Sequence, residues 1–196
     1  MSEEAKRGLQ LWLMRHGETA WSLSGAHTGR TDIPLTPRGE ERAQKIREYL
    51  DRRPFTLVLT SPMQRARETC RIAGYGDEAK VDPNLKEWDY GVFEGRTTQE
   101  IRRERPGWTV WDSPIPEGES LEQVAERARQ AIARAQTAGG DVALFSHAHF
   151  LRILTACWLG LSPSAGALFA LHTGSVSTLG FEHESRVIST WNRSFE

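Results

Sequence analysis

Three short apolar segments recur along the chain, and a longer pattern of helical spacing follows each of them. They occupy residues 8–14, 56–60 and 141–145. Apolar runs of this length are typical of strands that are buried on both faces of a sheet. Strands that alternate with helices indicate a mainly parallel sheet with helices on both faces. The sequence therefore predicts an α/β fold arranged as a three-layer α-β-α sandwich.

Capping residues indicate where the predicted helices begin. Thr36 followed by Pro37 opens the first, because Thr caps well and Pro is tolerated at the first helical position. Residues 61–64 form a capping-box pattern with Pro62 at the first helical position, so Arg65 should lie in the opening turn. The other predicted elements are helices beginning at capping boxes 97–100 and 120–123, a helix over 150–159, and closing strands over 175–182 and 186–191.

The composition fits a single domain that spans residues 1–196. Hydrophobic residues make up 38% of the chain and charged residues 26%, as in ordinary folded proteins. The formal net charge is −1, so no overall field attracts nucleic acid or an anionic membrane, and neither partner is predicted. Any anion site must be a local cluster of cations. The aromatic residues near the C-terminus, if exposed, permit a homodimer without requiring one.

The sequence carries no feature that predicts secretion or membrane insertion. Residues 1–8 are polar and charged, without the apolar region of a signal peptide. The longest apolar stretch, residues 150–161, contains Arg152 and is too short to span a bilayer. Cys70 and Cys157 could form only one bridge, so we expect two reduced thiols. These features predict a cytoplasmic protein.

Each of the three predicted strands ends in a polar turn that carries or leads to His or Arg. The first turn holds Arg15 and His16. The second leads to Arg65 one helical turn later, and the third holds His147. Ligands of parallel sheets lie beyond the carboxyl ends of the strands, where helix N-termini offer free N–H groups. Because guanidinium forks fit the oxygens of phosphate, neighbouring strands would form a phosphate pocket here.

This composition supplies a nucleophile but leaves the general acid open. Neutral imidazole can attack phosphorus, and His16 directly follows the first strand. A carboxyl group must protonate the leaving oxygen and later accept a proton from water. Glu18, Glu87, Asp89 and Glu94 are all candidates, and the residues alone do not choose among them.

Residues 15–19, Arg-His-Gly-Glu-Thr, resemble the signature of the histidine phosphatase superfamily, which includes the cofactor-dependent phosphoglycerate mutases. The resemblance continues in the same order from residue 9 to about residue 192, and it implies the phosphoglycerate mutase-like fold. Further matching segments are residues 32–36 with Gly39, a second arginine motif at 61–66, an acidic loop at 85–87 and 91–95, and a second histidine at 146–147.

The resemblance implies a role for each matching residue. His16 would be the phosphorylated nucleophile, and Glu87 the general acid and then the general base. Arg15, Arg65 and a protonated His147 would clamp the phosphate and replace a metal ion, so no metal and no cofactor is predicted. Substrate contacts are assigned to Ser22, Thr28, Gly29, Tyr90 and Ala148.

The sequence departs from the mutase or family pattern at three points, and the last of them favours hydrolysis over mutation. Ser22 stands where most mutases carry Asn, and Ser in this place resembles the sugar-bisphosphatase and acid phosphatase branch. Ala148 stands where the family usually has Gly, so its Cβ should crowd the pocket slightly. The chain also lacks room for the long insertion that helps mutases to hold a bisphosphate.

The sequence therefore predicts a metal-independent phosphatase of the histidine acid phosphatase type. Its partner would be a small phosphorylated metabolite, a sugar phosphate or similar phosphomonoester, which is hydrolysed through phosphohistidine. A phosphoglycerate mutase and a non-catalytic phosphate-binding domain are the alternatives. A metal site is a further alternative, because His147 and His149 would share a face of an extended strand, but no other ligand motif accompanies them.

Three segments are expected to form the rim of the pocket. They are residues 22–27, 87–90 and 105–120. Trp108 and Trp111 in the last segment either cover the substrate or have a structural role. The charged stretch 102–105 is interpreted as a solvated helix face.

Overall fold

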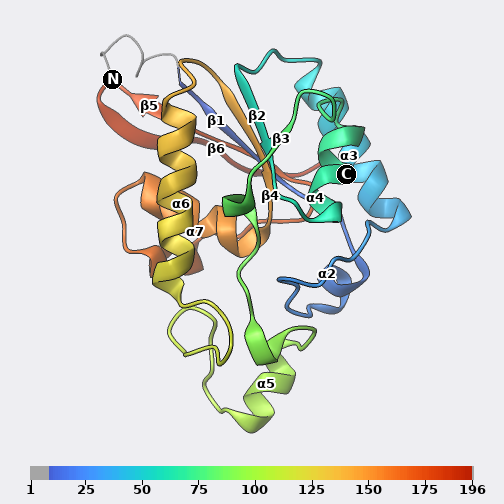
Figure 1. The fold of residues 1–196 in the computed structure, drawn as a ribbon, viewed down its shortest axis with the longest axis vertical. Coiled ribbons are helices and arrows are strands. Elements are labelled where there is room, and N and C mark those ends of the chain that lie inside the picture. The colour runs from blue at the N-terminus through green and yellow to red at the C-terminus, as the bar shows by residue number, and fades with distance from the viewer. Residues whose placement is uncertain (1–8, 196) are drawn as a thin grey trace.

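Six strands form one sheet within residues 9–195, the part of the chain that this computed structural model describes. The strand order is β3-β2-β4-β1-β5-β6, and helices lie on both sides of the sheet (Figure 1). The strands are β1 (Leu11–Arg15), β2 (Leu57–Thr60), β3 (Lys80–Val81), β4 (Val142–Ser146), β5 (Val176–Glu182) and β6 (Ser185–Arg193). The predicted start of the first strand at Gly8, and the expectation that residues 1–8 carry no signal peptide, lie outside the described residues.

The first four strands are parallel and the last two are antiparallel, which confirms a mainly parallel α/β sheet. Arg15 is paired with Ser146 at the ends of β1 and β4. Thr60 is paired with Phe145 at the ends of β2 and β4. The carboxyl ends of the three central strands therefore meet at one edge of the sheet.

The helices complete a three-layer sandwich. Helices α3 and α4 pack on one face of the sheet and α6 and α7 on the other, while α2 and α5 lie beyond its edge at the lower end of the view in Figure 1. The helices are α2 (Ala20–Ser24), α3 (Pro37–Leu50), α4 (Gln64–Ile72), α5 (Thr98–Glu104), α6 (Leu121–Gln136) and α7 (Ala148–Trp158). Within residues 9–195, no helix has the length and apolar character needed to cross a membrane.

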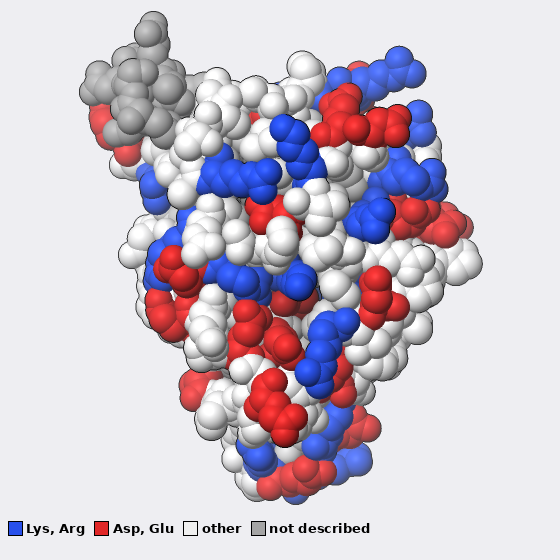
Figure 2. Space-filling model, viewed as in Figure 1, with Lys and Arg blue, Asp and Glu red and all other residues white. Residues whose placement is uncertain are grey.

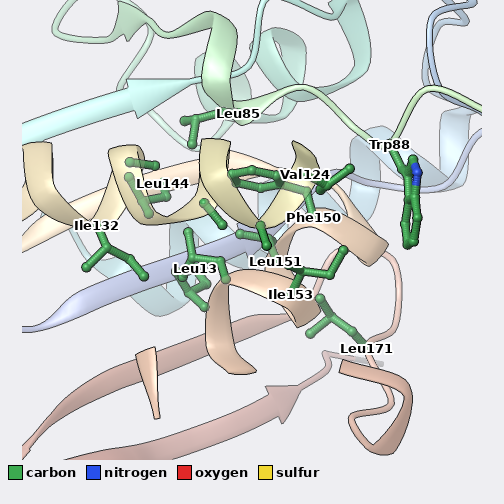
Figure 3. Close-up of a cluster of buried hydrophobic side chains, with 14 of the residues drawn as sticks. Leu13, Leu85, Trp88, Val124, Ile132, Leu144, Phe150, Leu151, Ile153 and Leu171 are labelled. Carbon is green, nitrogen blue, oxygen red and sulfur yellow. The ribbon is translucent and has the colours of Figure 1, made fainter. Parts of the chain in front are cut away.

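The core follows from the alternation of side chains along buried strands. Leu11 and Leu13 of β1 point to the cluster under α6 and α7, whereas Trp12 and Met14 point to the cluster under α3 and α4. Figure 3 shows the first cluster, in which side chains of β1, β4, α6 and α7 meet. Because both faces are covered, the central strands are apolar up to their carboxyl ends, where Arg15, Thr60 and Ser146 stand.

Charge is mixed over the surface that Figure 2 shows. Lys and Arg alternate with Asp and Glu, so no single sign dominates this face. Near the C-terminus, Trp191 packs against Phe169 and Phe195 against Tyr49, and both are half-buried within the chain. The homodimer stays a prediction.

Two helix starts differ from the sequence prediction. Helix α4 begins at Gln64, and the N-cap residue Met63 makes no side-chain cap. The capping box at 61–64 was therefore wrong, although Arg65 does lie in the opening turn. Helix α7 begins at Ala148, two residues early, because His147 has the extended conformation of an N-cap. His149 is thus helical, and the idea that it shares an extended strand with His147 was wrong.

Candidate active site

The carboxyl ends of β1, β2 and β4 bring the two predicted histidines together. His16 follows β1 directly, and His147 follows β4 as the N-cap of α7. Their ring centroids lie 5.1 Å apart. Gly17 packs directly against the start of α3, because a Cβ there would lie 2.2 Å from the carbonyl oxygen of Gly39. The predicted convergence of the strand-end turns is therefore present.

The hydrogen bond of His16 fixes its tautomer. Nδ1 lies 2.7 Å from the carbonyl oxygen of Gly17, and because a carbonyl can only accept, Nδ1 must carry the proton. Nε2 is then left with a free lone pair. Burial first, and then the charges of Arg65 and Arg15, hold the pKa of His16 well below its ordinary value of 6.5. His16 is therefore a neutral imidazole with a nucleophilic Nε2, and it lines the pocket.

Arg15 offers a donor beside this nucleophile. Its Nη1 donates to the carbonyl oxygen of Leu171, whereas its buried Nε has no hydrogen-bond partner within residues 9–195. Burial lowers the pKa of Arg15 to about 10, so the group remains charged at neutral pH. A buried charged donor without a partner is costly, and an anion would satisfy it.

Arg65 lies behind the pocket rather than in its lining. It is fully buried, and its nitrogens donate to the carbonyl oxygens of Thr28, Gly29 and Thr31 at 3.0–3.1 Å. Its Nε donates to Nδ1 of His147 at 3.2 Å. The structure thus gives Arg65 the task of holding the loop 28–31 and the second histidine, and a direct phosphate contact from it stays a prediction.

His147 is neutral in this arrangement. Its Nδ1 accepts from Arg65, so the proton of the neutral ring lies on Nε2, which donates to the hydroxyl of Ser61 at 2.8 Å. Burial first, and then the charge of Arg65, hold the pKa of His147 well below 6.5. Burial and a neighbouring guanidinium thus favour the neutral ring here, and a protonated His147 beside a bound phosphate stays a prediction.

Glu87 is the carboxylate that reaches the pocket. It is 6% exposed, and its oxygens accept from the backbone N–H groups of Trp88, His149 and Phe150 at 2.9–3.1 Å. Two of these donors belong to the first turn of α7. The N-terminus of α7 therefore orients Glu87 toward the site.

The other three candidate carboxylates are used elsewhere. Glu94 accepts from the N–H groups of Gly29 and Thr31, Glu18 from the hydroxyl of Thr36, and Asp89 from the N–H of Gly91. None of the three is among the described residues that line the pocket. Of the four candidates, Glu87 is therefore the one that lines the pocket, and its role as the general acid stays a prediction.

The pocket has a volume of about 390 Å³. It contains seven of the ten predicted site residues: Arg15, His16, Ser22, Thr28, Glu87, Tyr90 and Ala148. Arg65, His147 and Gly29 lie behind this lining. Gly29 packs so closely that a Cβ would lie 2.3 Å from the carbonyl oxygen of Trp88, which explains the need for glycine. The Cβ of Ala148 forms part of the lining, as expected.

Sequence reasoning missed the part of the wall contributed by helix α5 and its neighbours. The lining residues outside both the assigned site and the expected rim are Thr98, Arg102 and His149, whereas Gly25, Ala26, His27, Thr109, Val110 and Trp111 belong to the expected rim segments 22–27 and 105–120. His149 Nδ1 lies 2.6 Å from the hydroxyl of Tyr90, and the His27 ring lies 4.7 Å from the Tyr90 ring. Burial holds the pKa of His149 well below 6.5 and lowers that of His27 to about 4, so this wall carries neutral imidazoles.

Two expectations concerned the rim and the charged stretch beside it. Trp111 lines the pocket, whereas Trp108 is 3% exposed and belongs to the core. Residues 102–105 are exposed, as expected of a solvated helix face, and Arg102 of this stretch also lines the pocket. Among the described residues, no group of three His, Cys, Asp or Glu is arranged to hold a metal ion.

The sheet order, the strand-end histidines and the buried arginines define an enzyme class, and the comparisons with known proteins agree. The sequence profile of the histidine phosphatase superfamily (branch 1) matches residues 11–194. The chain therefore belongs to the histidine phosphatase superfamily.

Two named relatives and one solved structure are similar to this chain. An acid phosphatase of Mycobacterium tuberculosis is 40% identical over 187 residues, which are 93% of this chain and 92% of that protein. A sedoheptulose 1,7-bisphosphatase of Saccharomyces cerevisiae is 36% identical over 182 residues, 76% of this chain and 67% of its own length. The solved structure of an open reading frame product of Mycobacterium tuberculosis has a TM-score of 0.91 and 39% identity, with 96% of this chain and 99% of that chain covered. Family membership and these phosphatase relatives support phosphatase activity.

Proposed function

We propose that the protein hydrolyses small phosphomonoesters, such as sugar phosphates, through a phosphohistidine intermediate on His16. The observation that carries this proposal is the neutral His16, whose Nε2 is free in a pocket that Arg15 and Glu87 also line. A nucleophile, a cationic donor and a proton-transfer group are what a two-step phosphoryl transfer requires.

In the first step, Nε2 of His16 attacks phosphorus in line with the leaving oxygen. The N–P bond forms as the P–O bond to the leaving group breaks, and the carboxyl group of Glu87 supplies the proton that this oxygen needs. Arg15 balances the charge on the phosphoryl oxygens. Gly17 accepts the Nδ1–H bond throughout, which stabilises the charge that His16 gains on phosphorylation.

In the second step, water regenerates the enzyme. The carboxylate of Glu87 takes a proton from water, and the oxygen attacks phosphorus as the N–P bond breaks. His16 returns to the neutral form and inorganic phosphate leaves. Both steps use the same carboxyl group in opposite directions, so Glu87 ends in the state in which it began.

The size of the pocket supports a small metabolite as the partner. About 390 Å³ lies within the range of small-molecule sites and exceeds what a phosphoryl group alone fills. The relatives act, by their names, on small phosphate esters, including a sugar bisphosphate. Apart from Arg102, the rest of the pocket is lined by neutral polar, aromatic and small apolar residues, which suit the leaving group of such a metabolite.

The test measures phosphate release from p-nitrophenyl phosphate at acidic to neutral pH with EDTA present. Wild-type protein should release phosphate, and His16→Ala should abolish release. His183→Ala is the matched control, because His183 lies exposed in the turn between β5 and β6. In a rapid alkaline quench, labelled phosphate should remain on His16 of the wild type.

Three other outcomes would count against hydrolysis by this route. Turnover that survives His16→Ala would exclude the phosphohistidine. Loss of activity with EDTA would indicate a metal enzyme. Interconversion of phosphoglycerates that exceeds hydrolysis when a bisphosphate is added would favour a mutase.

A further inference from the structure

The pocket extends from the edge of the sheet to helix α5. Arg15, His16 and Glu87 lie where the strands end, and we call this part the sheet end. Thr98 and Arg102, which are four residues apart and therefore on one face of α5, line the other part, which we call the α5 end. Figure 1 shows α5 well beyond the edge of the sheet. A ligand that is phosphorylated at the sheet end thus reaches α5 with its leaving group.

Arg102 is held in place but keeps donors free. Its Nε donates to the carbonyl oxygen of Trp108 at 2.8 Å, which fixes the guanidinium against the loop that follows α5. Its two Nη groups make no hydrogen bond and no ion pair within residues 9–195. Arg96 beside the same helix differs, because Glu104 binds it at 2.6 Å. Arg102 is itself exposed to solvent, and its guanidinium is held at the pocket wall with both Nη groups available.

The charges of the other pocket residues show why Arg102 would select an anion. Glu87 at the sheet end is the one carboxylate among the described residues that line the pocket. The lining also includes His27, which is neutral because its pKa is lowered to about 4, and the uncharged indole of Trp111. The pocket therefore has a cation at each end, and its other lining residues apart from Glu87 are uncharged.

We propose that the natural substrate carries a second anionic group on its leaving group, a carboxylate or a second phosphate, and that Arg102 binds it through its Nη groups. This inference rests on the proposed phosphatase function, and it names the substrate class of the same site. Arg102 is then a specificity residue, because it contacts the part of the substrate that does not react. A planar fork of two N–H donors fits the paired oxygens of either anion.

The test compares esters with one and with two anionic groups. Glycerol 3-phosphate against 3-phosphoglycerate tests the carboxylate, and fructose 6-phosphate against fructose 1,6-bisphosphate tests the second phosphate. The readout is the ratio of kcat/KM within each pair. A charge-assisted bidentate contact predicts that wild-type protein prefers the doubly anionic ester about ten- to a hundredfold in at least one pair. The pair that shows the preference identifies the anion.

Substitutions test which residue causes the preference for the doubly anionic ester. Arg102→Gln should remove most of it, and Arg102→Lys should keep part of it, because the charge remains without the fork. Arg103→Gln is the matched control, since Arg103 is exposed on the same helix and does not line the pocket. A purely structural role of Arg102 would lower kcat/KM for both esters of a pair equally, and this result would overturn the inference.

A neighbouring groove is the alternative binding site for the second anion. It has a volume of about 770 Å³, is lined by Arg38, Arg42 and Lys45, and adjoins the pocket through Arg15 and Ser22. If Arg42→Gln removes the preference and Arg102→Gln does not, the second anion binds there and the inference is wrong. It is also wrong if wild-type protein hydrolyses p-nitrophenyl phosphate but prefers neither doubly anionic ester. Wild-type protein that hydrolyses none of these esters would instead contradict the proposed function.

Discussion

The two ends of the pocket are supported by different kinds of structure. At the sheet end, Arg15 belongs to a central strand whose side chains are buried on both faces, and Glu87 is tied to the N-terminus of α7. At the α5 end, Arg102 projects from a helix of seven residues that lies beyond the sheet. A rigid sheet suits chemistry that must be the same for every ester. A peripheral helix suits contacts that distinguish one leaving group from another.

This difference predicts how substitutions at the two ends should behave. Changes at the sheet end should lower turnover of every ester, because each must pass through the same phosphoryl transfer. Changes at the α5 end should depend on the leaving group. The following experiments address these two expectations, beginning with the largest effect.

Arg15→Met should cause the largest loss at the sheet end among the residues that do not themselves react. An arginine that neutralises the charge of a transferring phosphoryl group contributes about 10³–10⁵-fold to kcat. The loss should be similar for p-nitrophenyl phosphate and for sugar phosphates, since both present the same phosphoryl oxygens. Arg67→Met, at an exposed position of α4, is the control. A loss that varies strongly with the leaving group would show that Arg15 does not act on the phosphoryl group.

Glu87→Gln should have a smaller effect that depends on the leaving group. General acid catalysis contributes about 10²–10⁴-fold, and an alkoxide needs the proton far more than p-nitrophenolate does. Steady-state kcat should therefore fall more for a sugar phosphate than for p-nitrophenyl phosphate. Glu94→Gln provides the comparison, because Glu94 only holds the N–H groups of Gly29 and Thr31. Equal losses on both substrates in Glu87→Gln would remove Glu87 as the acid.

The same contrast explains what the sequence could predict. The sheet end could be predicted from the sequence because buried strands have a clear apolar pattern. The residues that follow these strands, such as His16 and His147, must meet at one edge of the sheet once the strands are neighbours. The choice of Glu87 was not accessible from the residues alone, since it depends on backbone N–H groups of His149 and Phe150 that lie more than 60 residues away.

The α5 end was harder to predict from the sequence, for a physical reason. A short helix rich in Arg and Glu has the composition of a solvated surface, and nothing in the charge pattern separates Arg102 from Arg103. The four-residue spacing of Thr98 and Arg102 could have indicated a shared face, but only the packing of α5 over the pocket shows what that face meets. The start of α7 was misplaced because His is not a typical N-cap residue.

Low pH should destabilise the α5 end because it protonates His27. Burial lowers the pKa of folded His27 to about 4, whereas an unfolded His titrates near its ordinary value of 6.5. Between these values the unfolded chain binds a proton that the folded chain does not, so stability falls as the pH falls through this window. The contribution at neutral pH is on the order of 3 kcal/mol, most of it lost on reaching pH 4. His16, His147 and His149 have lowered pKa values too and act in the same direction.

His27→Gln isolates that contribution, because Gln keeps a polar group near Thr98 but does not titrate. Urea unfolding at neutral pH and at a pH just above 4 should show a smaller acid-induced loss of stability in the variant than in the wild type. His183→Gln, at an exposed turn, should leave the loss unchanged. Hydrogen exchange shows which part of the molecule opens first in acid. Amides of α5 should lose protection before those of β1 and β4, because only the α5 end lacks the support of the sheet. Simultaneous loss at both ends would mean that the pocket unfolds as one unit, and the division between a rigid chemical end and a separable recognition end would not hold.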